Sequence, residues 1–171
     1  TRTYLELMRT IREGRRKGSL LGVLDCSGTA MGARLLRRWL AYPLLEPEAI
    51  ERRLDAVEDL IREPVLREEL RELLTTVADL ERLAARLSTG LAGPRDLIAL
   101  RRSGETLPAF QVLLGGGGGQ RAPALAELTG GLDDLSDLTA LIERAVVDDP
   151  PVSLKDGGVI RPGYHPELDE V

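Results

Sequence analysis

Apolar side chains recur along this chain every three to four residues, and proline separates one such run from the next. In residues 29–42, Thr29 precedes an apolar stripe and Pro43 follows it. The stripe consists of Met31, Leu35, Leu36, Trp39 and Leu40. This spacing places apolar residues on one face of an α-helix, and threonine before and proline after are typical of helix boundaries. We therefore predict a helix here whose apolar face, Trp39 included, is buried.

The same pattern predicts further helices downstream. They begin near Pro47, Pro64, Asp79, Pro94 and the pair Asp133-Asp134. The helix from Pro94 should continue to Leu113 with a kink or break at Pro108, because proline removes a hydrogen-bond donor and clashes with the preceding turn. Aromatic residues make up only 3% of the chain and leucine carries most of its apolar content, which favours helices over sheets.

These observations predict an all-α fold, an irregular bundle of antiparallel helices with a short extended or hairpin-like segment near the C-terminus. Residues 1–150 should form a helical core domain, and residues 151–171 a connection leading out of it. Within 151–171 few aliphatic side chains accompany Gly157, Gly158, Pro162 and Gly163. We expect residues 154–171 to be the least stable part of the chain, because so little burial offsets the entropy lost on ordering the backbone.

Charge is distributed unevenly along the chain. The formal net charge is −5, which argues against the whole chain being a nucleic-acid clamp. Residues 1–45 nevertheless contain nine basic and three acidic side chains. Arg15, Arg16 and Lys17 stand together there, and they are candidate contacts for DNA or for another domain. A solvated surface without a partner is the alternative, and the sequence leaves both open.

Two glycine-containing stretches do not qualify as nucleotide-binding loops. Residues 14–19 read GRRKGS, in which Lys17 precedes Gly18, whereas a phosphate-binding loop needs glycine, lysine and a hydroxyl residue in that order. The five glycines at 115–119 lack the spacing of a dinucleotide fingerprint, and they should form a mobile linker. We expect no cofactor to bind to this chain.

The side chains that could perform catalysis or hold a metal are isolated. His165 is the only histidine and Cys26 the only cysteine, so zinc ligands are lacking. Asp148 and Asp149 have no third carboxylate at ligand spacing and should instead end a helix and cap a turn. We predict neither catalytic nor metal-binding residues. A single cysteine and the absence of a long apolar run indicate a cytoplasmic protein without membrane contact.

Four segments, taken together, resemble the core domain of the MutS family of DNA mismatch-recognition ATPases. The longest, residues 18–60, reads GSLLGVLDCSGTAMGARLLRRWLAYPLLEPEAIERRLDAVEDL. The opening TRTYLEL, the stretch DLERLAARLSTGLAGPRDLIAL at 79–100 and DGGVIRPGYHPELDE at 156–170 are also similar to family motifs. Their order and spacing extend over nearly the entire chain.

The resemblance implies a mechanical domain rather than a catalytic one. In that family the core domain joins the connector and mismatch-binding domains to a DNA clamp and an ATPase. ATP, magnesium, mismatched double-stranded DNA and a homodimer are thereby implied for the parent protein, while its active-site motifs have no positions in this chain. Residues 151–171 would lead into a long lever helix that is truncated here. Because the chain begins without an initiator Met, we expect a piece of a longer protein.

A second hypothesis is a free-standing helical adaptor whose basic N-terminal patch binds nucleic acid or a protein partner. A Walker motif several hundred residues downstream in the same gene would separate the two hypotheses.

Overall fold

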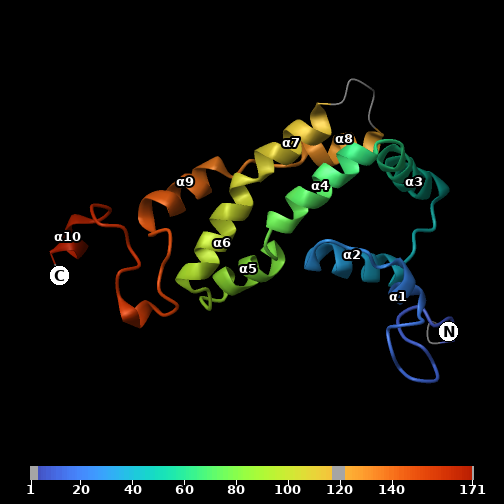
Figure 1. Cartoon of the computed structure of the whole chain (residues 1–171), viewed down its shortest axis with the longest axis horizontal. Helices are drawn as coiled ribbons and strands as arrows, with labels where there is room; N and C mark the ends of the chain where they lie inside the picture. The colour runs from blue at the N-terminus through green and yellow to red at the C-terminus, as the bar shows by residue number, and fades with distance from the viewer. Residues whose placement is uncertain (1–3, 117–121, 171) are drawn as a thin grey trace. The chain divides into compact units, whose positions relative to one another are not determined.

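The computed structural model describes residues 4–116 and 122–170, and their regular structure is helical (Figure 1). The α-helices are α1 (Leu20–Leu24), α2 (Ala30–Ala41), α3 (Pro47–Arg62), α4 (Pro64–Thr76), α5 (Leu80–Ser88), α6 (Pro94–Glu105), α7 (Leu107–Gly115), α8 (Pro123–Gly130), α9 (Ser136–Ala145) and α10 (Pro166–Asp169). A 3₁₀ turn, η1, covers Leu154–Asp156. The described residues contain no strand, only an isolated antiparallel bridge between Val146 and Ile160. The predicted all-α class is confirmed.

Local chemistry explains most helix boundaries. The Thr29 hydroxyl accepts a hydrogen bond from the Gly32 amide at 3.0 Å, and the Asp79 carboxylate accepts one from the Arg82 amide at 3.2 Å. Both are side-chain caps of the kind that satisfies free amides in a first helical turn. The predicted break at Pro108 is also confirmed, since α6 ends at Glu105 and α7 restarts at Leu107.

The start of α9 differs in detail from a simple cap. The residue immediately before α9, its N-cap, is Leu135, whose backbone is left-handed with a φ of 51°. The two preceding aspartates still contribute, because the Asp134 carboxylate accepts from the Ser136 amide at 3.0 Å and Asp133 accepts from the Leu135 amide at 2.9 Å. The acidic pair therefore shapes the turn that leads into the helix.

The chain divides into two compact units, residues 1–75 with 119–126 and residues 76–118 with 127–171. In the first unit the side chains of Leu21, Leu66 and Leu125 are buried. This division concerns the packing of helices, and the domain boundary near residue 150 stays a prediction. Among the described residues no helix has the length and apolar character needed to cross a membrane.

The second unit is organised around α6 and α9, which run side by side in antiparallel directions (Figure 1). Its core consists of Ile98, Ile142, Val146 and Val159, with Leu97, Leu100, Leu138 and Ala145 packed around them. Gly104 allows the two helices to approach closely, because a Cβ at this position would lie 2.6 Å from Cγ2 of Thr139. A larger residue at 104 would therefore collide with α9.

The prediction that Trp39 is buried is wrong. Its side chain is 40% exposed, and no residue of α2 is buried. The guanidinium of Arg53 lies over the indole ring, 3.9 Å from its centroid, so a cation covers part of the ring. The stripe of α3, which contains Ile50, Leu54 and Val57, is likewise exposed. Helical spacing fixes which residues share a face, but not whether another element covers that face.

Candidate joint between the helices and the C-terminal connection

The chain that leaves α9 returns to the end of the same helix. After Ala145 it passes through residues 146–149, turns, and comes back at residues 159–161. The Val147 amide donates to the Val159 carbonyl at 3.1 Å, and the Arg161 amide donates to the Ala145 carbonyl at 2.9 Å. Val159 is also part of the core formed by α6 and α9. The outgoing chain is therefore fixed to the end of α9 at residues 159–161.

Glycines make this return possible. Gly157 and Gly158 have φ values of +69° and +64°, and Gly163 has a φ of +81°. Side chains other than glycine rarely adopt this left-handed region, because their Cβ crowds the backbone carbonyl. The glycines of the stretch DGGVIRPGY are thus required by backbone geometry. The chain reverses at the first two and turns again at the third.

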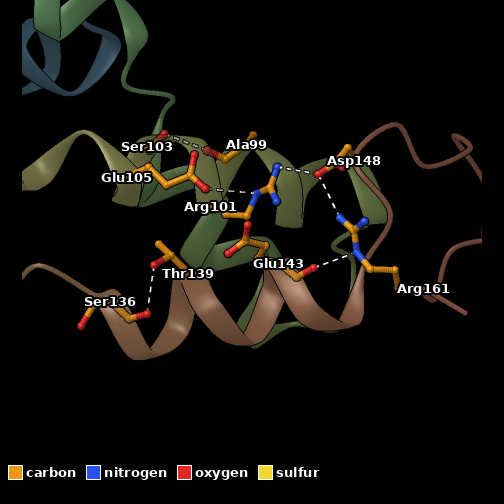
Figure 2. Close-up of polar contacts among 9 residues, drawn as sticks. All are labelled: Ala99, Arg101, Ser103, Glu105, Ser136, Thr139, Glu143, Asp148 and Arg161. Atoms are coloured by element: carbon orange, nitrogen blue, oxygen red, sulfur yellow. Dashed lines mark hydrogen bonds and ion pairs between the residues drawn. The ribbon is translucent and has the colours of Figure 1, made fainter. Parts of the chain in front are cut away.

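Two arginines meet one carboxylate beside this return. Arg101 of α6 donates from Nη2 to Oδ1 of Asp148 at 2.9 Å, and Arg161 approaches the same oxygen with Nη2 at 3.0 Å. Figure 2 shows the two guanidinium groups approaching Asp148 from two sides. Arg161 also donates from Nε to the Glu143 carbonyl at 2.9 Å. Asp148 therefore connects α6 to the returning chain, and Arg161 connects that chain to α9.

Arg101 is unusual in this cluster because it is only 8% exposed. Its Nε lies 3.4 Å from the Glu105 carboxylate, close enough for an ion pair, yet this atom is buried without a hydrogen bond. A buried guanidinium loses hydration and needs a partner to offset that loss. Its shorter contact with a carboxylate is the hydrogen bond to Asp148. Asp148 therefore offsets part of the cost of burying the Arg101 guanidinium in this unit.

The arginines also change the protonation of Asp148. Hydrogen bonds from Arg161 and Arg101 lower the pKa of this carboxyl below its ordinary value. A carboxyl with a depressed folded-state pKa stabilises the fold above its unfolded pKa and loses that contribution as the pH falls through the folded value. The ion pairs of Asp148 with Arg101 and Arg161 should therefore be formed at neutral pH and should weaken below about pH 4.

Replacing Asp148 with asparagine should lower the midpoint of urea unfolding at pH 7, because both arginines lose their anionic partner. The difference between the original chain and Asp148→Asn should shrink as the pH falls below about 4. It should also shrink in 1 M salt, since Asp148 is 64% exposed and salt screens charges near solvent. Asp149→Asn is the matched control and should leave the midpoint unchanged. A difference that does not depend on pH would contradict this interpretation.

Further polar contacts hold neighbouring segments on α6. Ser103 is fully buried, and its hydroxyl donates to the Ala99 carbonyl at 2.8 Å while it accepts from the Ala78 amide at 2.9 Å. Near the start of α6, the Asp96 carboxylate accepts from the Gly93 amide at 2.8 Å and pairs with Arg86 of α5 at 2.9 Å. At the other side, Arg95 donates to the Pro150 carbonyl at 3.2 Å. Helix α6 therefore contacts both α5 and the chain that follows α9.

The basic and acidic residues that the sequence analysis proposed as candidates lie in different parts of the structure. Arg15 pairs with Glu13 at 3.4 Å, Arg16 pairs with Asp25, and Lys17 is exposed. These three lie in the first unit, and whether they contact DNA or a domain stays a prediction. Asp148 does not cap a turn as expected, because its carboxylate binds the two arginines instead. Arg101 was not among the predicted site residues, because its partner Asp148 is 47 positions away and no local pattern links the two.

The other candidates do not gather into a site. Cys26 and His165 are both exposed. Within residues 4–116 and 122–170, no group of three or more histidine, cysteine, aspartate or glutamate side chains could hold a metal ion. Most of the five-glycine run lies outside the described residues, while Gly115 ends α7 and Gly116 follows it as the C-terminal cap. The prediction that residues 154–171 are least stable also stays open, although Val159 is buried in the core.

The described residues form helices, and the chain that follows α9 returns to the α6–α9 pair. Comparison with known families identifies the family of this chain. The sequence profile of MutS domain III matches residues 1–168, and the chain belongs to this family. The resemblance drawn from the four segments is confirmed.

Individual relatives agree with the family match. The chain is 50% identical over its full length to the DNA mismatch repair protein MutS of Symbiobacterium thermophilum, and 51% identical over its full length to that of Myxococcus xanthus. It is 47% identical, over 98% of its length, to the corresponding protein of Methanothrix thermoacetophila. In each case the chain spans 19% of the relative's length. It therefore corresponds to about a fifth of those proteins.

Proposed function

We propose that this domain couples the nucleotide state of an ATPase part to the DNA grip of a clamp part within a full-length mismatch-repair protein. The family and the names of the relatives support a role in mismatch repair. The observation that carries the mechanical part is the attachment of residues 159–161 to α9 and α6. Through this attachment, movement of the outgoing chain would be transmitted to the helix pair.

The contacts at this attachment define the path of transmission. The backbone amide of Arg161 donates to the Ala145 carbonyl. Its side chain donates to the Glu143 carbonyl and forms an ion pair with the Asp148 carboxylate. Asp148 in turn binds Arg101 in the interior of α6. A displacement of the chain beyond Arg161 would have to break these contacts or move both helices. We expect both helices to move with the chain, because packed interiors shift as discrete units.

The other components of the mechanism belong to the full-length protein. There we expect ATP and magnesium at an ATPase domain, mismatched double-stranded DNA at the clamp, and a homodimer as the assembled form. Connector, clamp and ATPase domains would be the partners of this chain. The present residues would perform no chemistry and would transmit force between those parts.

Replacing Gly157 with proline in the full-length protein should uncouple ATP binding from DNA release. Proline fixes φ near −65° and cannot adopt the +69° observed, so the path of the outgoing chain must change. We expect the effect of ATP on DNA dissociation to fall at least about fivefold, the lower end of typical coupling between sites. The rate of ATP hydrolysis measured without DNA should stay within about twofold of that of the original protein, a small change compared with the expected loss of coupling. Stopped-flow DNA release and steady-state ATP hydrolysis measure the two quantities.

Gly90→Pro is the matched control. Gly90 has the same φ of +69°, has equally open surroundings, and donates its amide to a carbonyl three residues earlier, as Gly157 does. It follows α5 and lies outside the returning chain. If Gly90→Pro reduced coupling as much as Gly157→Pro, general strain would explain the result and the proposed path would be wrong.

A further inference from the structure

A tight turn follows the point at which the returning chain meets α9. Residues 161–164 read RPGY, and the Tyr164 amide donates to the Arg161 carbonyl at 3.1 Å. Pro162 occupies the second position of this turn, and Gly163, with a φ of +81°, occupies the third. Proline and a glycine of positive φ at these two positions are the features of a type II β-turn. The backbone therefore fixes where the side chains that flank the turn lie.

This turn and the last turn of α9 border one pocket. Its volume is about 710 Å³, which is within the range of small-molecule sites. The lining residues are Arg144, Arg161, Pro162, Gly163, Tyr164 and His165. Four of their side chains can donate a hydrogen bond, namely two guanidinium groups, a phenol and an imidazole, and no aspartate or glutamate is among them. A lining of this kind suits an anion.

Arg144 brings a positive charge to the pocket that is not used elsewhere. It is exposed and lies in the last turn of α9. Among the residues that the structure describes, its guanidinium has neither a hydrogen bond nor an ion pair. All five N–H donors of this group are therefore available to a ligand in the pocket.

Arg161 is the second cation, and its position is already fixed. Its Nε donates to the Glu143 carbonyl at 2.9 Å, and its Nη2 lies 3.0 Å from Oδ1 of Asp148. Figure 2 shows no contact between the third guanidinium nitrogen, Nη1, and the residues drawn there. Because two of the three nitrogens are held by the protein, little side-chain entropy remains to be lost when a ligand binds to the third.

We propose that this pocket binds the phosphate group of a small phosphorylated ligand. A phosphate monoester has three acceptor oxygens and a charge of about −1.5 to −2 at pH 7, whereas a carboxylate has two oxygens and one charge. The phosphate can therefore accept from more of the four donors, and guanidinium groups bind its oxygens in pairs. Side chains supply the donors here, so the site needs no glycine-rich phosphate loop.

The position of the pocket gives such a ligand a structural effect. Arg144 belongs to α9, and Arg161 belongs to the returning chain. A phosphate bound to both guanidinium groups would join the helix to that chain by a further contact. This binding site follows from the lining of the pocket and does not depend on the proposed coupling mechanism.

Proton NMR of the 171-residue chain tests for this site, because His165 is its only histidine and the imidazole Cε1–H is a single reporter. Titration with inorganic phosphate at constant pH and ionic strength should shift this signal until it saturates, while acetate should not. Adenosine 5′-monophosphate should also shift it. Equal affinity for both phosphate probes would assign the site to the phosphate group alone, and tighter binding of the nucleotide would add a contact with its base or sugar, for which Tyr164 and His165 offer rings. No saturation with either probe, or equal affinity for acetate, would overturn the proposal.

Substitution of Arg144 separates the pocket from general charge effects. Arg144→Gln should weaken phosphate binding at least about tenfold, which corresponds to about 1.4 kcal/mol. Arg144→Lys keeps the charge but loses the paired hydrogen bonds, so its affinity should be intermediate.

Arg102→Gln is the matched control. Arg102 is likewise exposed, lies in the last turn of α6, makes no side-chain hydrogen bond or ion pair within the described residues, and does not line the pocket. Its replacement should leave the affinity for phosphate unchanged. Equal weakening by Arg102→Gln and Arg144→Gln, or undiminished binding by Arg144→Gln, would show that this pocket is not the site.

Discussion

Replacing Ile142 with alanine should lower the free energy of unfolding of the second unit by about 2–5 kcal/mol. Ile142 is 5% exposed and lies in the core with Ile98, Val146 and Val159. These neighbours come from α6, from the end of α9 and from the returning chain, so they have little freedom to collapse into the space left behind. The loss therefore includes both the transfer free energy of the removed atoms and the cost of a residual cavity.

Urea unfolding followed by circular dichroism measures this loss. Leu141→Ala is the control, because Leu141 is the adjacent residue of α9 but is 44% exposed. Its replacement should cost less than about 1 kcal/mol, as expected for a partly exposed side chain. Equal losses for the two variants would mean that the core is not centred on Ile142.

Replacing Gly104 with leucine should destabilise the same unit by about 1–3 kcal/mol or more. The new side chain would begin 2.6 Å from Thr139 Cγ2, a distance that real Cβ atoms do not show. Helices α6 and α9 would have to separate at this point, and the core formed by Ile98 and Ile142 would open with them. The destabilisation would occur although leucine has a higher helix propensity than glycine, which is about 0.8–1 kcal/mol less favourable than alanine in a helix interior.

Gly130→Leu separates collision from helix propensity. Gly130 is the last residue of α8, and a Cβ there meets no atom within 4 Å. This variant should be neutral or slightly more stable in the same urea titration. Gly104→Ala with Thr139→Ser gives a further check, because removing Cγ2 should recover most of the loss caused by the alanine. No recovery would show that the close contact with Thr139 is not responsible.

Short-range chemistry made several elements predictable. Thr29 and Asp79 cap helices with side chains that bond amides only three residues ahead. Pro64 and Pro108 separate helices because the clash of a proline ring acts on its immediate neighbours. Glycine occupies positions 157, 158 and 163, where the backbone has positive φ. Interactions of this kind are encoded within a few residues, so one sequence suffices to identify them.

Burial was predicted less well, because it depends on elements distant in sequence. The stripe containing Leu35 and Trp39 correctly indicated one face of α2, but none of the residues of α2 is buried. Asp148 was expected to cap a turn, and its carboxylate instead lies between two arginines. Neither outcome can be derived from periodicity, which describes a helix in isolation.

The sequence by itself determined the helical class, the main breaks between helices and membership of the MutS domain III family, because these depend on local spacing and on ordered motifs. Only the tertiary structure decided that Arg101 and Arg161 share one oxygen of Asp148, and that Gly104 brings α9 against α6. It also brought Arg16 into one pocket with Arg34 and Arg37. The physical reason is the same in each case. Residues far apart in the chain meet only after helices have packed, and packing depends on the shapes and charges of all the faces involved.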